Sequence, residues 1–490
     1  MSEPRYASRV TALLSRFRRD GKANTAVIFA IALLPILTAI GCAVDYSLAT
    51  RMKAKLQSAA DAASVASISQ KSPGYTAAAA MNGNGRVSAG VTDANNVFNG
   101  NISAVSGGFT NLVLTSTVTK SHTTLTSTVT FSADVPVVFM KVLGYQNLTV
   151  TGSSTSSASL PLYLDFYLML DVSGSMGLPS TNAEQTRLAA INPDNYSLYP
   201  NGCTFACHFS SQNACNQGGS YPPYGGQKYN TNGYCLGYSL SRTAGNSSNT
   251  PVTSCPTDGT GACIQLRADA VGYAVTQLFI TANATEKVTD QFRIGLYPFI
   301  QYLYSYFPLT SNISGSPTNS STINYAAANL ATLLDTGVNS NLGSGGTHFE
   351  NAFPSMNSLI TSVGNGSSAN STLPYVFLVT DGAQNNQTQW GGGWAGNNNA
   401  TIMDASLCTT LKNRGIMISV LYIPYQPIQN PTTFANSEDF AVNAIIPNIP
   451  GDLQSCASPN FFFTANTPAD ITSALNAMFN QALVTAHITN

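Results

Sequence analysis

The chain has 490 residues, of which 9% are charged and 43% are hydrophobic. The charged fraction is well below the ~25% of an average soluble protein. The hydrophobic fraction is high enough to build cores, which excludes an intrinsically disordered chain. The formal net charge of −1 leaves no basic surface to neutralise phosphates, so we expect no nucleic-acid partner. At ~100–200 residues per domain, the length predicts two or three domains.

The N-terminal residues predict a membrane anchor. A basic tail at 1–22 precedes an uncharged, largely apolar stretch at 23–44, and ~20 such residues span a bilayer as a helix. A cleaved signal peptide has a shorter apolar region, and Ala39–Cys42 lacks the leucine of a lipoprotein signal. By the positive-inside rule we expect a single-pass protein of the inner (cytoplasmic) membrane, with the N-terminus inside and the C-terminal domain periplasmic or extracellular.

Residues 45–159 predict a helical stalk and a small β-rich spacer. The Ala-rich stretch Tyr46–Ser69 favours continuation of the membrane helix. Four features follow from turn residues and β-branched runs: a helix stop at Lys71–Gly74, a hairpin within Asn111–Phe131, extended pieces at Val135–Gly144 and Leu148–Ser154, and a linker at Ser153–Ser159.

Long apolar runs alternate with helical patterns from residue 160 to 490, which predicts an α/β domain with a doubly wound, mostly parallel sheet. We expect strands at Leu162–Leu170, Phe292–Phe299, Tyr375–Thr380, Ile416–Ile423 and Phe461–Phe463. We expect helices at Leu266–Ile280, Tyr325–Leu334, Phe349–Ile360, near Thr401–Arg414, and from Thr467 onward. Pro298 is expected to mark a strand end and Pro354 to interrupt a helix. A ligand site is expected at the carboxyl ends of the strands.

Three segments at this edge carry oxygen ligands: Asp171-Val-Ser173-Gly-Ser175, Thr347 in Gly-Gly-Thr-His, and Asp381 in Thr-Asp-Gly. Carboxylates and hydroxyls suit Mg²⁺, Ca²⁺ or Mn²⁺ and are wrong for zinc. A cation held there would leave coordination to be completed by an acidic group on a partner. The alternative is that the aspartates cap helices and the serines satisfy turns.

These three motifs, in this order, resemble the metal-ion-dependent adhesion site of von Willebrand factor A domains. The resemblance implies that the cation ligands are Asp171, Ser173, Ser175, Thr347 and Asp381. The sequence from Asp20 to Ser64, DGKANTAVIFAIALLPILTAIGCAVDYSLATRMKAKLQSAADAAS, resembles the start of TadE/TadG-like Tad (Flp) pilus-assembly proteins.

Together the resemblances imply a TadG-like protein with a von Willebrand factor A-type domain at 160–490. We expect a non-enzymatic role in pilus assembly or anchoring. In this role a divalent cation, with Mg²⁺ preferred over Ca²⁺ and Mn²⁺, binds an acidic residue of a pilus or secretion-system component. A surface or periplasmic adhesion protein unrelated to pili and a metal-dependent hydrolase are the alternatives. No phosphate loop, zinc pair or triad spacing is present, and we interpret His348 as a surface contact beside Thr347.

Eight of the nine cysteines follow the apolar stretch, as disulfides in an oxidising compartment would require. We pair Cys408 with Cys456. The other six belong to an insertion at 177–263 and allow 15 pairings; they are Cys203, Cys207, Cys215, Cys235, Cys255 and Cys263. The insertion either sets partner specificity or is a passive loop. Cys203-x3-Cys207-His208 lacks the second ligand pair of a zinc site and has one residue too many for haem attachment.

Overall fold

The computed structural model describes residues 21–178, 181–182, 266–316, 319–335, 339–390, 393–396, 399–427 and 434–489. The chain divides into two compact units, unit 1 at Met1–Leu160 and unit 2 at Pro161–Asn490. Residues 1–20 of the predicted basic tail and all six insertion cysteines lie outside the described residues.

Unit 1 begins with one continuous helix, α2 (Gly21–Ala66), which includes the predicted span and most of the predicted stalk. It ends before the predicted stop at Lys71–Gly74, where Pro73 and Gly74 instead begin the next helix. The stretch of α2 from Val27 to Val44 leaves large apolar side chains exposed, and the helix is long and apolar enough to cross a membrane. Its later turns instead bury Leu56, Ala59, Ala60 and Ala63. One helix therefore has an unpartnered apolar half and a half that belongs to a folded core.

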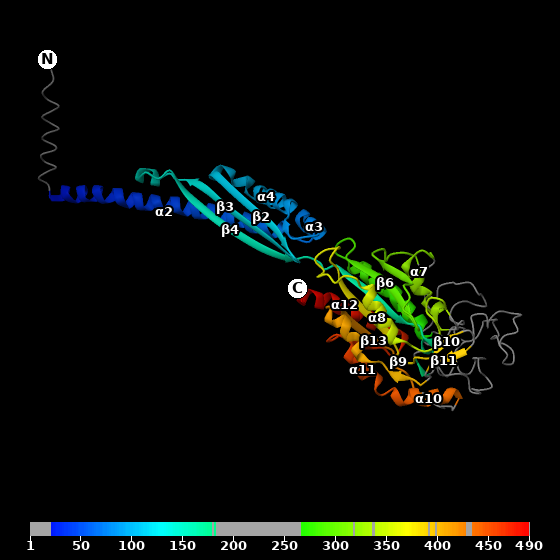
Figure 1. Cartoon of the computed structure of the whole chain (residues 1–490). Helices are drawn as coiled ribbons and strands as arrows, with labels where there is room; N and C mark the ends of the chain where they lie inside the picture. The colour runs from blue at the N-terminus through cyan, green and yellow to red at the C-terminus, as the bar shows by residue number, and fades with distance from the viewer. Residues whose placement is uncertain are drawn as a thin grey trace, which may run out of the picture. The chain divides into compact units, whose positions relative to one another are not determined.

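The core of unit 1 lies between helices and one face of an antiparallel sheet with the order β1-β2-β3-β4. Its strands are β1 (Gly85–Arg86), β2 (Thr110–Ser121), β3 (Thr124–Pro136) and β4 (Asn147–Ser159). The shorter helices are α3 (Pro73–Ala80), α4 (Ser88–Ile102), η1 (Ser103–Gly108) and η2 (Met140–Leu143). Phe98 of α4 and Phe131 of β3 pack together in this core, and α2 and α4 lie along the sheet (Figure 1).

Two predictions for unit 1 are wrong. Ser153–Ser159 is not a linker but part of β4, which pairs with β3 along its whole length. Its small polar side chains are satisfied in the strand, since the hydroxyl of Ser64 on α2 lies 3.0 Å from that of Ser154 and 2.8 Å from that of Ser156. Val135–Gly144 is not extended throughout, because β3 ends at Pro136 and η2 follows. Pro136 has no backbone N–H, so it cannot donate a hydrogen bond that would continue the strand pairing.

Unit 2 is built on a mixed sheet with the order β14-β13-β8-β5-β6-β7, in which the edge strand β7 alone is antiparallel. These strands are β5 (Leu164–Asp171), β6 (Phe292–Phe299), β7 (Phe307–Thr310), β8 (Leu373–Thr380), β13 (Met417–Tyr422) and β14 (Phe462–Thr464). Short strands outside the sheet are β9 (Ala383–Gln384), β10 (Thr388–Trp390), β11 (Gly393–Ala395) and β12 (Thr401–Ile402). The four central strands β13, β8, β5 and β6 are almost wholly buried, as their apolar sequences predict.

Helices cover both faces of the sheet (Figure 1). One face packs against α6 (Arg267–Thr285), α7 (Ile323–Ala328), η6 (Leu330–Leu333) and α12 (Pro468–Thr489). The other packs against α8 (Phe349–Leu359), η7 (Ala405–Cys408), α9 (Thr409–Asn413), α10 (Phe434–Ile445) and α11 (Ile449–Cys456). Phe166 and Tyr167 of β5 point to opposite faces and enter different cores, as alternation along a strand requires.

Three helix predictions for unit 2 need correction. Pro354 lies inside α8 without ending it. The segment Thr401–Arg414 is not one helix but β12, η7 and α9 in succession, because the carboxylate of Asp404 accepts the N–H of Ser406 and starts a new turn there. Tyr325–Leu334 divides into α7 and η6. Helices α3, α4, α10 and α11 and strand β7 were not predicted from the sequence.

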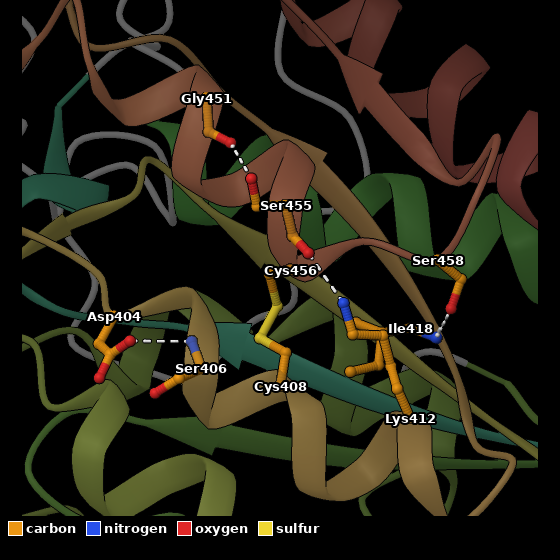
Figure 2. The surroundings of a disulfide bond; sticks show 9 residues. All are labelled: Asp404, Ser406, Cys408, Lys412, Ile418, Gly451, Ser455, Cys456 and Ser458. Carbon is orange, nitrogen blue, oxygen red and sulfur yellow. Dashed lines mark hydrogen bonds between the residues drawn. A yellow bond between two sulfur atoms is a disulfide. The ribbon is translucent and has the colours of Figure 1, made fainter.

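A disulfide joins Cys408 to Cys456, as predicted, and links the end of η7 to the end of α11 (Figure 2). Both cysteines are fully buried in the second core. The adjacent Lys412 ammonium donates to the carbonyl of Ser455 at 2.8 Å. The crosslink therefore joins two elements that already pack together.

Replacing both Cys408 and Cys456 with alanine is expected to lower the free energy of unfolding of unit 2 by about 4 kcal/mol, the chain-entropy value for a loop of this size. Denaturant unfolding of the full chain in detergent would measure the loss. Cys42→Ala is the control, because Cys42 is a free cysteine in unit 1. An unchanged unfolding midpoint for the double variant would contradict the prediction.

Candidate functional site

Asp171 is the last residue of β5, and its buried carboxylate is held from two sides. Oδ1 accepts the backbone N–H of Ser173 at 2.9 Å, which shapes the turn after the strand. Oδ2 accepts the hydroxyl of Thr380 at 2.6 Å, from the end of the neighbouring strand β8. The carboxyl ends of two parallel strands thus meet at this side chain, as the sheet topology predicts.

The serine motif continues from β5 into η3 (Gly174–Gly177). The hydroxyl oxygens of Ser173 and Ser175 lie 3.2 Å apart, and both side chains are buried. The turn therefore presents two hydroxyl oxygens beside the carboxylate of Asp171.

Asp381 follows β8 directly and is fully buried. Gly382 after it has a φ of +78°, a left-handed conformation that suits glycine and turns the chain away from the strand. Oδ2 of Asp381 is paired, but Oδ1 has no hydrogen-bond partner. An unpaired buried carboxylate oxygen is costly, and a ligand at this oxygen would remove that cost.

The two carboxylates influence each other. Burial raises the pKa of Asp171 to about 7, and the charge of Asp381 adds to the increase. Burial also raises the pKa of Asp381, although the guanidinium of Arg267 and the hydroxyl of Ser175 oppose that change. The site concentrates negative charge away from water, and a bound cation would favour the ionised form of both groups.

Arg267 is the residue that the sequence analysis missed. It is the first residue of α6 and is fully buried. Nη1 donates to Oδ2 of Asp381 at 2.9 Å, and Nη2 donates to the carbonyl of Pro424 at 3.0 Å. The guanidinium carbon lies 5.1 Å from the ring centre of Tyr425. The available signal was an arginine opening an apolar helix in a chain with few charges.

The backbone of Thr347 connects it to the segment that follows Asp381. Its N–H donates to the carbonyl of Asn385, four residues after Asp381, at 2.7 Å. The loop before it is held by Asp335, whose Oδ1 accepts the hydroxyl of Ser344 and whose Oδ2 accepts the N–H of Gly345, both at 2.7 Å. The N–H of Asp335 in turn donates to the carbonyl of Val172 at 3.1 Å. Asp335, also missed from sequence, ties the threonine loop to the turn that follows Asp171.

His348 is not a surface contact. It is buried, with Nδ1 2.7 Å from Oε1 of Glu350 and Nε2 3.1 Å and 3.0 Å from the carbonyl oxygens of Gly345 and Gln387. Burial lowers its pKa, but these hydrogen bonds, led by that to Glu350, outweigh burial and raise it overall. The imidazole connects two loops and has a structural role.

The residues present fit a hard cation. Asp171, Ser173, Ser175 and Asp381 supply carboxylate and hydroxyl oxygens from two strand ends, and one carboxylate oxygen is unpaired. Within the described ranges, no group of three or more His, Cys, Asp or Glu side chains could hold a metal. The hydroxyls are therefore essential to any cation site here.

A similarity to a known family is found in the N-terminal part of the chain. Residues 23–80 match the Tad family of Flp pilus-assembly TadE/G-like proteins. No match is found among curated proteins. The family match and an apolar helix able to span a membrane support a membrane anchor and a pilus-related role.

Solved structures similar to the chain include three pilus proteins. The pilus adhesin SpaC from Lactobacillus rhamnosus GG is 12% identical over 76% of this chain, with a TM-score of 0.32, and the chain spans 34% of its length. The PilB minor pilin from Streptococcus sanguinis is 11% identical over 76% of this chain and 78% of its own, with a TM-score of 0.33. The vWF domain of the type V pili tip protein Mfa5 from Porphyromonas gingivalis is 11% identical over 67% of this chain and 97% of its own, with a TM-score of 0.31.

Proposed function

We propose that this protein is a membrane-anchored, non-enzymatic component of a Tad-type pilus system. Unit 2 is a von Willebrand factor A-type domain that binds an acidic group of a pilus or secretion-system protein through a divalent cation. The observation that carries the proposal is the convergence of Asp171, Ser173, Ser175 and Asp381, together with the carboxylate oxygen of Asp381 that is left unpaired.

The sheet topology supports the domain type and the place of the site. Strand β5 lies between β6 and β8, and the chain runs outward from it in both directions. This is the switch point of a doubly wound sheet, where ligands bind beyond the carboxyl ends of the strands. The switch point lies between β5 and β8. Asp171 is the last residue of β5, and Asp381 directly follows β8.

The cation would be held by Asp171, Ser173, Ser175 and Asp381, with Thr347 on the adjoining loop. Mg²⁺ suits this set best, since it prefers few carboxylates and compact oxygen ligands, and Ca²⁺ or Mn²⁺ are the alternatives. When bound, the cation would supply a positive charge that attracts an acidic side chain of the partner. Binding, not turnover, is the expected activity, and EDTA-sensitive ester or peptide hydrolysis would contradict it.

The anchor supports the cellular setting. An apolar helix at the N-terminus and the TadE/G-like match at residues 23–80 fall on the same segment. We place this helix in the inner membrane with the N-terminus in the cytoplasm and everything after the apolar stretch exported, because basic residues precede that stretch.

Asp171→Ala is expected to abolish cation-dependent partner capture and to reduce surface pili strongly, because it removes one of two carboxylates at the site. The tagged full chain would be crosslinked in its own cells and purified with Mg²⁺ or with EDTA, captured proteins would be identified, and pili would be counted by electron microscopy. Asp404→Ala is the control, since Asp404 is an exposed carboxylate that caps η7. Normal capture of pilus components by the Asp171 variant would refute the proposal, as would capture that EDTA leaves unchanged.

A further inference from the structure

The connection between β3 and β4 is an exposed apolar loop. It runs over residues 137–146 and includes η2; we call it the β3–β4 loop. Val142 is 81% exposed, and four further apolar or aromatic side chains are about half exposed or more: Val138, Phe139, Leu143 and Tyr145. Five such side chains on a ten-residue loop are unusual for a surface that faces only water.

This loop is fixed to α2 by a buried carboxylate. Asp45 of α2 accepts three backbone N–H groups of the loop, from Val138 at 3.0 Å, Phe139 at 2.8 Å and Met140 at 2.7 Å. Charge-assisted hydrogen bonds of this kind are stronger than neutral ones. The loop therefore keeps its conformation, and its apolar side chains stay exposed.

Contact with Gly41 fixes the position of the β3–β4 loop along α2. A Cβ atom at Gly41 would lie 2.5 Å from Cβ of Phe139, so only glycine lets Phe139 lie against the helix here. Gly41 is one turn before Asp45 on the same helix. Figure 1 shows the connection between β3 and β4 beyond the end of the sheet, beside α2.

The exposed surface of α2 changes from apolar to basic just beyond Gly41 and Asp45. Before this point lies the exposed apolar stretch Val27–Val44, and after it come the exposed basic residues Arg51, Lys53 and Lys55. With a helical rise of ~1.5 Å per residue, Arg51 and Lys55 lie ~9 and ~15 Å beyond Asp45 along the helix. An apolar stretch, an aromatic side chain and basic residues in succession are typical of a helix leaving a bilayer through its headgroup layer.

We propose that the β3–β4 loop inserts into the lipid leaflet where α2 leaves the membrane. The occupant of its apolar surface is the boundary between phospholipid acyl chains and headgroups, because the surface is continuous with the exposed apolar stretch of α2. Tyr145 and Lys141 have the amphipathic side chains that place polar ends among headgroups. Unit 1 is thus attached to the membrane at two points, a spanning helix and a partly embedded loop, which restricts its tilt and depth.

This inference rests on the proposed membrane anchor, and one experiment tests the two separately. The full chain would carry a single tryptophan in a Trp390→Phe, Trp394→Phe background and would be reconstituted in vesicles of phospholipids brominated at different depths. Tryptophan would be placed by Leu37→Trp in the apolar stretch, by Val142→Trp in the loop, or by Val65→Trp as the control. Val65 is an exposed valine of α2 that lies ~30 Å past Asp45.

Because interfacial apolar groups lie ~5–10 Å deep, the tryptophan of Val142→Trp is expected to be quenched most by bromines near the headgroups. The tryptophan of Leu37→Trp should be quenched by deeper bromines, and that of Val65→Trp by none. Quenching of Leu37→Trp with none of Val142→Trp would overturn the loop inference and leave the anchor intact. Absence of quenching in both would overturn the anchor itself. Quenching of Val142→Trp that falls as protein is packed more densely into the vesicles would identify a second copy of the chain as the occupant and reject lipid.

Discussion

Arg267→Met is expected to destabilise unit 2 by about 3–5 kcal/mol, the usual cost of removing one partner of a buried ion pair. The guanidinium is fully buried and is the charged partner of Oδ2 of Asp381. Without it, Asp381 would lie beside Asp171 and would have no cationic partner among the described residues. Denaturant unfolding of the full chain in detergent and EDTA, followed on unit 2, would measure the loss.

Unit 2 offers a matched control in the pair Arg293 and Asp165. Arg293 Nε and Nη2 bind the two carboxylate oxygens of Asp165 at 2.7 and 2.6 Å, but the Arg293 side chain is 39% exposed. Asp165 is itself buried, but solvent reaches the guanidinium and the hydroxyl of Thr372 still donates to the carboxylate, so Arg293→Met should cost less than Arg267→Met, about 1–2 kcal/mol. Equal losses for the two variants would contradict the assignment of Arg267 as the essential buried counter-charge.

A double variant separates loss of charge balance from loss of packing. Adding Asp381→Asn to Arg267→Met removes both members of the pair, so no uncompensated carboxylate remains at that position. We expect the double variant to recover a large part of the stability lost by Arg267→Met alone. Failure to recover would assign the cost to packing of the arginine side chain against Tyr425 and not to its charge.

The residues of the site differ in how far sequence could predict them. Asp171, Ser173 and Ser175 stand together after an apolar run, so one short motif indicated both their place and their chemistry. Arg267 reaches Asp381 across 114 residues of sequence, and Asp335 fixes the threonine loop from outside every recognised motif. Periodicity and short motifs contain no information about such long-range pairs.

The same distinction applies to the fold. The four central strands of unit 2 were predictable because burial on both faces requires continuous apolar runs. The second half of β4, Ser153–Ser159, was mistaken for a linker because its side chains are small and polar. Pairing with β3 and hydroxyl contacts to Ser64 make it part of the strand. Edge strand β7 has only four residues, three half-buried and one exposed, and no such run.

Arg267 also determines how much charge the site leaves for a cation. It binds Oδ2 of Asp381, whose other carboxylate oxygen, Oδ1, has no hydrogen-bond partner. Asp171, by contrast, is hydrogen-bonded to neutral groups, which are the N–H and hydroxyl of Ser173 and the hydroxyl of Thr380. The negative charge that remains uncompensated therefore belongs mainly to Asp171, and a dication would bring that charge into balance.

Asp171→Asn is accordingly expected to have opposite effects on stability and on cation binding. Without a cation, the variant should be as stable as the parent chain or more stable, because it removes a buried charge that Asp381 repels. Asparagine preserves the shape and still offers one oxygen to the N–H of Ser173. With Mg²⁺ at 100 times its dissociation constant the parent chain should gain about 2.7 kcal/mol, and the variant should gain almost none.

Thermal unfolding of unit 2 in the full chain, with EDTA and with increasing Mg²⁺, would measure both effects. Asp404→Asn is the control, since its exposed carboxylate should leave the Mg²⁺ response unchanged. An Mg²⁺-dependent shift that persists in Asp171→Asn would place the cation elsewhere. A loss of stability in EDTA would instead mean that the charge of Asp171 is needed by its hydrogen bonds to Ser173 and Thr380, and the carboxylate would then be structural, as a turn-forming aspartate is.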